Sequence, residues 1–228
     1  PVELEYAVNI NDDPDINDEF CLLQIKPMVI GGLERSKHLI TNNEIDRICK
    51  SNVVLGDGTI DNIFNILYIH PDSFDRALTS NITKEIEILN RQLGKNNPYL
   101  LIGPGRWGTA DPWLGIPVNW KQISYAKVIV ELGLEELNPE PSFGSHFFQN
   151  VTSLRIGYFT VQKQDDEVNI DLDWLDAQSV KQSTKYIRWI ELDDPLLINI
   201  DGSTGEGYIM KSQLPTKELM NEEDSTGI

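Results

Sequence analysis

The chain has 228 residues, and its 19 basic and 36 acidic side chains give a formal net charge of -17. This charge argues against nucleic acid and anionic membrane surfaces as partners, because both are held mainly by Lys and Arg. No apolar run approaches the roughly 20 residues that a membrane-spanning helix needs. The two cysteines, Cys21 and Cys49, are too few for a disulfide framework. We therefore expect reduced thiols in a cytoplasmic protein.

The first predicted elements are two strands. Residues 2–10 alternate between apolar and polar side chains, as in a half-buried strand. A second apolar run at 20–29 follows an Asp-rich loop, and together the two runs predict a hairpin. Because the first strand begins at the second residue, we expect the chain to be a piece of a longer polypeptide. The pair Gly31-Gly32 then marks a predicted boundary between structural units.

The following segment, residues 31–165, alternates between predicted strands and helices. Asn42 or Asn43 can cap a short helix carrying Ile45, Ile48 and Cys49. A longer helix is indicated by apolar residues at helical spacing, namely Ile82, Ile86, Leu89 and Leu93. Further apolar runs predict strands at 53–55, 63–69, 99–102, 126–132 and 156–161. This alternation favours an α/β fold in which helices cover a mixed sheet.

The last segment, residues 166–228, is different in character. Short strands are predicted at 186–192, 196–200 and 207–210, around glycine-containing turns. We expect a small antiparallel β addition here, ending in an acidic tail. The predicted organisation is therefore a terminal hairpin at 1–30, an α/β extension at 31–165 and a β-rich end at 166–228.

The hairpin carries the sharpest motif. Glu5 lies in the first strand, and Gln24-Ile25-Lys26-Pro27 lies in the second. Alternate residues of adjacent strands point to one face of the sheet. A carboxylate on that face can hold a hard cation, and a cation beside it can hold phosphate oxygens. From the residues alone, the alternative is an amphipathic hairpin whose charged side chains simply face water.

This hairpin resembles the end of the ATP-grasp, nucleotide-binding domain of phosphoenolpyruvate synthase and pyruvate phosphate dikinase. In that family a D-I-E-W-A strand precedes a strand ending in Q-x-R-P. The resemblance implies that Glu5 holds Mg²⁺ and that Gln24 faces the phosphates of ATP. Lys26 stands where the family usually has Arg, and a lysine is a point charge without the planar fork of a guanidinium. The resemblance covers the first part of the chain, and the lysine- and arginine-bearing lobe that completes such an ATP site is not in this sequence.

A second resemblance covers much of the remaining chain. The run Y-L-L-I-G-P-G-R-W-G-T-A-D-P-W-L-G at 99–115 and the run G-S-H-F-F-Q-N at 144–150 resemble the C-terminal extension of bacterial proteins named for the same family. In this family of transferases, ATP phosphorylates a protein histidine, which then phosphorylates pyruvate. We expect this chain to contribute part of the ATP–Mg²⁺ site, with the remainder of the parent polypeptide as partner, and not to catalyse the reaction alone. The alternative is a non-catalytic scaffold or regulatory ligand-binding module fused to an ATP-grasp domain.

The glycine-rich run after the strand at 99–102 is a candidate site for a nucleotide or a small anionic ligand. Backbone N–H groups near Gly103, Gly105 and Gly108 could approach an oxyanion, and Arg106 adds a fork of donors. The run lacks the P-loop spacing, and Pro104 removes one donor. The alternative is a tight structural turn pinned by Trp107 and Trp113, in which Arg106 pairs with an acidic neighbour.

His146 is the last candidate. It follows Ser145, a potential helix cap, and a histidine at a helix start that faces a cleft could act as an acid or base or contact a phosphate. The alternative is a core histidine among Phe143, Phe147 and Phe148. Asp111, Glu131 and His146 could be imagined as metal ligands, but no pair has the usual ligand spacing.

Overall fold

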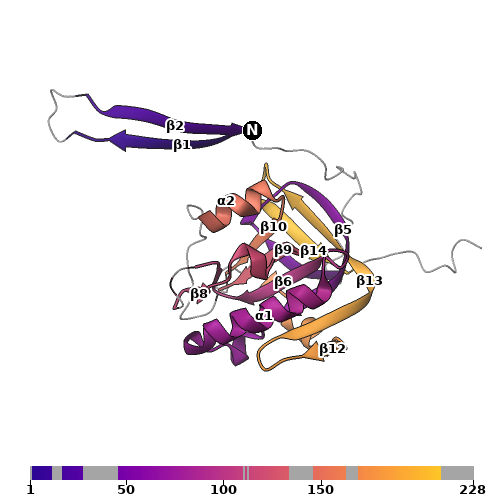
Figure 1. Cartoon of the computed structure of the whole chain (residues 1–228). Coiled ribbons are helices and arrows are strands. Elements are labelled where there is room, and N and C mark those ends of the chain that lie inside the picture. The colour runs from indigo at the N-terminus through magenta and orange to yellow at the C-terminus, as the bar shows by residue number, and fades with distance from the viewer. Residues whose placement is uncertain are drawn as a thin grey trace, which may run out of the picture. The chain divides into compact units, whose positions relative to one another are not determined.

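The computed structural model describes residues 2–11, 17–27, 46–109, 111, 113–133, 146–162 and 169–211. Two compact units are present, residues 1–32 and 33–228. The protein is mostly β: one unit is a two-stranded hairpin, and the other is built on a large curled mixed sheet with one main helix (Figure 1).

The hairpin consists of β1 (Val2–Asn9) and β2 (Glu19–Pro27), which pair antiparallel. This confirms the predicted pair of strands. A register shift follows Glu5, so Tyr6 pairs with Leu22 rather than with Leu23. The Tyr6 and Phe20 rings stack with their centroids 5.2 Å apart.

In the second unit, ten described strands form one sheet. The strand order is β11-β3-β14-β13-β5-β6-β9-β10-β4, and β12 also pairs with β13. The strands are β3 (Arg47–Ser51), β4 (Val54–Leu55), β5 (Gly58–Tyr68), β6 (Tyr99–Pro104), β9 (Ala126–Leu132), β10 (Gly157–Val161), β11 (Asn169–Ile170), β12 (Val180–Ser183), β13 (Arg188–Asp201) and β14 (Glu206–Met210). Strands β5, β6, β9 and β10 run parallel, whereas the other pairs in the sheet are antiparallel. A separate small sheet joins β7 (Arg106–Trp107) to β8 (Gly115–Ile116).

The helices are few and short. They are α1 (Thr79–Leu93), α2 (His146–Ser153) and α3 (Leu172–Ala177), with 3-10 helices η2 (Pro71–Ser73), η3 (Arg76–Leu78) and η4 (Trp120–Gln122). Helix α1 confirms the spacing argument, because Ile82, Ile86, Leu89 and Leu93 are all buried. No helix in the described ranges is long and apolar enough to cross a membrane.

The parallel strands are buried on both faces, which explains their continuous apolar runs. In β6, Tyr99 and Leu101 belong to a core cluster that includes α1, whereas Leu100 and Ile102 belong to a second cluster. Successive side chains of a strand point to opposite faces, so the two clusters lie on the two sides of the sheet. Figure 1 shows α1 crossing one of these sides beside β6.

One wrong prediction concerns the segment around Ile48 and Cys49. The helix predicted there is strand β3, and both side chains are buried where β3 pairs with β14 and β11. Its predicted capping residues, Asn42 and Asn43, lie outside the described residues.

The C-terminal strands are also not a separate addition. The long strand β13 pairs with β5, and β14 pairs with β3, so both belong to the large sheet. The two strands predicted at 186–192 and 196–200 form one continuous strand, β13. Its register with β5 shifts between Glu191 and Leu196, a segment that contains Pro195. A proline removes one ladder donor, which fits an interruption of register there. The acidic tail lies outside the described residues.

Candidate functional site

The hairpin brings two of the predicted site residues into register. Glu5 lies directly opposite Gln24, and the next pair on the same face is Glu3 with Lys26. Residues directly opposite in an antiparallel ladder have Cβ atoms about 4.5–5.5 Å apart and share one face. Glu5 and Gln24 are exposed. Together they offer a carboxylate and an amide oxygen, both of which are ligand types for a hard cation. The side chain of Lys26 is not among those described.

The glycine-rich turn uses its backbone N–H groups internally. Gly105 N donates to the Leu132 carbonyl at 2.8 Å, Arg106 N to Leu114 at 2.9 Å and Gly108 N to Ile116 at 2.9 Å. Trp107 N donates to Glu131 Oε1 at 2.8 Å. All four consecutive donors from Gly105 to Gly108 therefore have protein acceptors. This arrangement favours a structural turn over a cradle for an anion.

Packing explains why glycines occupy this turn. A Cβ on Gly103 would lie 2.6 Å from Cζ2 of Trp107. A Cβ on Gly108 would lie 2.0 Å from Cδ2 of Phe147, and Gly108 also has a φ of 71°. Trp107 is fully buried and therefore pins the turn as expected, whereas Trp113 is 63% exposed and does not.

Glu131 is the acidic neighbour of this turn. It is 2% exposed, and its Oε2 accepts a hydrogen bond from the Tyr158 hydroxyl at 2.5 Å. Burial raises the pKa of Glu131 to about 7, while the hydrogen bonds from Tyr158 and Trp107 and the charge of Arg106 oppose that rise. Burial, together with Glu131, also raises the pKa of Tyr158. A carboxyl with such a pKa can change its charge near neutral pH.

Arg106 lies close to this cluster and is incompletely paired. Its guanidinium lowers the pKa of Glu131 through its charge, yet its Nε atom is buried and makes no hydrogen bond within the described part of the chain. The acidic neighbour expected for Arg106 is therefore Glu131, which interacts with it through charge and not through a hydrogen bond from Nε.

The position of the cluster in the sheet is informative. Glu131 is in register with Gly103 of β6 and with Thr160 of β10. Because these three strands are parallel, their carboxyl ends lie at the same edge of the sheet, which is where ligands bind in open α/β sheets.

The other predicted site residues are not brought into this cluster by any described contact. His146 begins α2, but its side chain is not described. Its neighbour Phe147 is buried and stacks on Trp120 with ring centroids 4.4 Å apart. Asp111 is exposed, and its Oδ1 accepts a hydrogen bond from Trp113 N at 2.9 Å. Among the described residues, no three His, Cys, Asp or Glu side chains are grouped so as to hold a metal ion.

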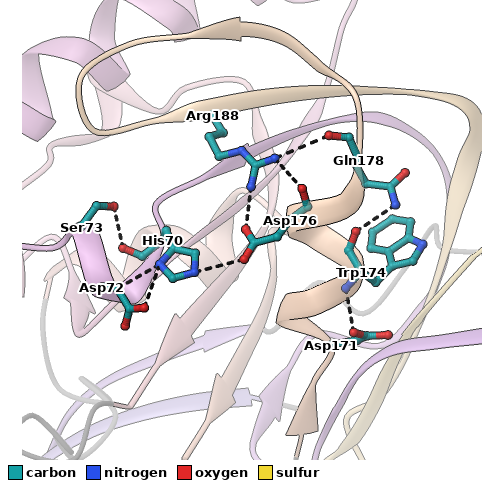
Figure 2. A network of polar contacts seen from close by, with 8 residues as sticks. All are labelled: His70, Asp72, Ser73, Asp171, Trp174, Asp176, Gln178 and Arg188. Atoms are coloured by element: carbon teal, nitrogen blue, oxygen red, sulfur yellow. Dashed lines mark hydrogen bonds and ion pairs between the residues drawn. The ribbon is translucent and has the colours of Figure 1, made fainter.

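A polar network that the sequence did not indicate lies where β5 ends (Figure 2). His70 Nδ1 accepts a hydrogen bond from Asp72 N at 3.0 Å, and His70 Nε2 lies 3.1 Å from Asp176 Oδ2. Arg188 Nη1 donates to the other oxygen of Asp176 at 2.5 Å. The backbone donor at Nδ1 assigns the proton of a neutral His70 to Nε2. Both ring nitrogens are then engaged, so the network fastens β5, α3 and β13 together and leaves His70 no free basic nitrogen. A histidine directly after an apolar strand was the one signal in the sequence that could have pointed to it.

Comparison with models of known protein families found none that matches this chain. Comparisons with curated proteins and with solved structures likewise found no significant match.

Proposed function

We propose that the hairpin is one wall of an Mg²⁺–nucleotide site in a phosphotransferase similar to phosphoenolpyruvate synthase and pyruvate phosphate dikinase. In this proposal Glu5 binds Mg²⁺, Gln24 faces the phosphates of ATP, and Lys26 supplies positive charge. The supporting observation is the register of the hairpin, in which Glu5 lies opposite Gln24 and Lys26 follows on the same face.

The chemistry of such a wall is limited. Mg²⁺ usually keeps several water molecules and is held by one or two carboxylates together with the phosphates of the substrate. Glu5 alone is a sufficient carboxylate for that mode, but the donors that would hold the other side of the phosphates have to come from elsewhere. We therefore expect this chain to bind Mg²⁺–ATP with a Kd above about 1 mM, which corresponds to only about -4 kcal/mol.

The surface of the hairpin agrees with a role as part of a larger site. Leu4 is 50% exposed and Ile25 is 55% exposed. A two-stranded hairpin with uncovered apolar side chains is at best marginally stable in water. Contacts with the remainder of a parent polypeptide would cover these side chains.

For residues 33–228 we propose a non-catalytic scaffold or regulatory module. The observation that favours this function over a second phosphate site is that the backbone donors from Gly105 to Gly108 are consumed within the protein. The chain as a whole would then support phosphoryl transfer in a cytoplasmic parent protein without catalysing it alone.

A paramagnetic NMR experiment tests the hairpin proposal in the regime of weak binding. Mn²⁺ replaces Mg²⁺, and amide signals are recorded as Mn²⁺–ATP is added to the full chain. Amides around Glu5 and Gln24 are expected to broaden at millimolar ligand. Glu5→Gln should abolish the broadening. Glu19→Gln should preserve it, because Glu19 pairs with Asn9 at the far end of the hairpin.

Three results would overturn the proposal. The first is an absence of broadening at millimolar Mn²⁺–ATP, and the second is broadening that survives Glu5→Gln. The third is micromolar affinity, which would mean that the chain contains a complete nucleotide site.

A further inference from the structure

Three neighbouring side chains form a buried polar line across two parallel strands. Glu131 belongs to β9, and Tyr158 and Thr160 belong to β10. Their exposed fractions are 2%, 1% and 4%. Tyr158 and Thr160 are two residues apart on one strand and so share a face, and Thr160 is in register with Glu131. Three polar side chains are thus held together away from water.

Each oxygen of Glu131 has a hydrogen-bond partner, and this arrangement suits an ionised carboxylate, which accepts at both oxygens. The Tyr158 hydroxyl donates to Glu131 Oε2 at 2.5 Å. The Thr160 hydroxyl lies near the Tyr158 hydroxyl, but Thr160 Oγ1 makes no hydrogen bond among the described residues. The buried hydroxyl of Thr160 can therefore still accept a hydrogen bond.

We propose that Glu131, Tyr158 and Thr160 form a proton-linked hydrogen-bond switch. In the ionised arrangement, Tyr158 donates to Glu131 Oε2, and Thr160 Oγ1 has no hydrogen-bond partner among the described residues. In the neutral arrangement, a proton from solvent is bound to Oε2, which then donates to the Tyr158 oxygen, and the Tyr158 hydroxyl turns to donate to Thr160 Oγ1. One proton is gained and forms an O–H bond at Oε2, no other covalent bond is formed or broken, and the Tyr158 hydroxyl hydrogen rotates.

The surroundings place this change near neutral pH. Burial raises the pKa of Glu131, and the groups that oppose the rise are Tyr158 of β10 and Trp107 N and Arg106 of β7. Gly103 and Pro104 of β6, which lie beside Glu131 and Leu132 in the ladder, carry no charge. Within the described residues, Arg106 is the charged group that acts on Glu131. The two forms of the carboxyl are therefore close in free energy at ordinary cellular pH.

The switch acts on the turn from Gly105 to Gly108. Trp107 N donates to Glu131 Oε1, and this bond is stronger when its acceptor is ionised. Protonation of Glu131 weakens that bond and also removes the negative charge that faces Arg106. The turn is then held less firmly, and Arg106 loses its attraction to the carboxylate of Glu131.

Carbon NMR on the full chain tests the switch directly. The side-chain carboxyl carbon of Glu131, assigned by its loss in Glu131→Gln, is followed from pH 5 to 9. The expected midpoint is about 7. The ring Cζ of Tyr158 and the Hε proton of Arg106 should shift with the same midpoint, because the hydroxyl hydrogen of Tyr158 changes its acceptor and Arg106 loses its neighbouring charge.

Two variants separate the switch from a single hydrogen bond. Thr160→Val keeps the shape and the backbone bonds of Thr160 but removes the acceptor that the neutral arrangement needs. The midpoint should therefore fall, by about half a pH unit or more. Thr160→Ser, which retains the hydroxyl, should stay at the midpoint of the parent chain.

The proposal fails if Thr160→Val leaves the midpoint unchanged. It also fails, without any variant, if Glu131 of the parent chain titrates below about pH 5.5 or if Tyr158 Cζ does not follow the carboxyl. These last two measurements keep the proposal testable even if a substitution prevents folding.

Discussion

Glu131 and Tyr158, on the adjacent parallel strands β9 and β10, share a buried hydrogen bond of 2.5 Å. The bond joins the interior of the sheet to the turn from Gly105 to Gly108, because the other oxygen of Glu131 accepts from Trp107 N. A carboxyl in such a position links the stability of the fold to pH.

The first prediction concerns that link. The folded-state pKa of Glu131 is raised from its ordinary value of 4.5 to about 7. Stability associated with neutral Glu131 is therefore fully present below pH 4.5 and is lost as pH rises through about 7. Glu131→Gln is neutral at every pH and can still accept from Trp107 N. The difference in free energy of unfolding between Glu131→Gln and the parent chain should therefore rise in favour of the variant between pH 5 and 8. The rise should be on the order of 3 kcal/mol at most. Urea denaturation at several pH values measures this difference, and a constant difference would contradict the prediction.

The second prediction concerns the packing of Phe147 on the turn. Gly108→Ala introduces a Cβ that would overlap the Phe147 ring, at a residue whose φ is 71°. Gly205→Ala is the control, because Gly205 has a φ of 79° and the one atom within 4 Å of an added Cβ is Asn52 O at 3.3 Å. Both variants place an alanine at a positive φ, and only Gly108→Ala drives its Cβ into an aromatic ring. Gly108→Ala should be the less stable by about 1–3 kcal/mol in chemical denaturation. Equal stabilities would mean that α2 does not pack on this turn.

The third prediction distinguishes a scaffold from an anion site. Inorganic phosphate should leave the melting temperature of the chain unchanged relative to chloride at matched ionic strength. The reason is that the backbone donors around Arg106 already have protein acceptors. Scanning calorimetry of the parent chain and of Arg106→Ala measures the effect. Stabilisation by phosphate in the parent chain that disappears in Arg106→Ala would instead establish an anion site at the turn.

The fourth prediction concerns the network around Asp176. Asp176→Asn removes the negative charge that both His70 and Arg188 contact. These side chains are partly exposed, so the expected loss of stability is about 1 kcal/mol or less, and it should shrink as salt is added. Asp173→Asn, an exposed position in the first turn of α3, is the control and should cost less. Denaturation at low and high salt measures both, and equal losses in the two variants would contradict the role given to Asp176.

The parts of this fold that were predictable are those specified by neighbouring residues. Helix α1 follows from the spacing of its own apolar side chains, and the hairpin follows from two alternating runs joined by a polar loop. Strand β3 was not predictable in this way. Its side chains Ile48 and Cys49 are buried by strands β14 and β11 from the other end of the unit, and that tertiary pairing overrides a weak local preference.

The candidate site shows the same division. Glu5 and Gln24 could be matched because a hairpin fixes its own register. Glu131 and Tyr158 are 27 residues apart, and their contact depends on how two parallel strands align across a crossover. Arg106 and the glycines could be recognised from the sequence as a turn, because a glycine-rich run directly after a strand favours one. The hydrogen-bond acceptors of their N–H groups, however, lie in β9 and in or next to β8. The local sequence does not specify where these strands lie.

The place of β3 in the sheet also has a consequence for how the polypeptide acquires its fold. Strand β3 comes early in the chain, yet its ladder neighbours β14 and β11 are both made much later. During synthesis on the ribosome, β3 therefore lacks its two ladder partners until most of the unit has been made. Sheets closed by such distant pairings fold slowly and expose unpaired edges in the meantime. A chain released before β14 would leave β3 and β13 with open edges, and we expect such truncated products to aggregate.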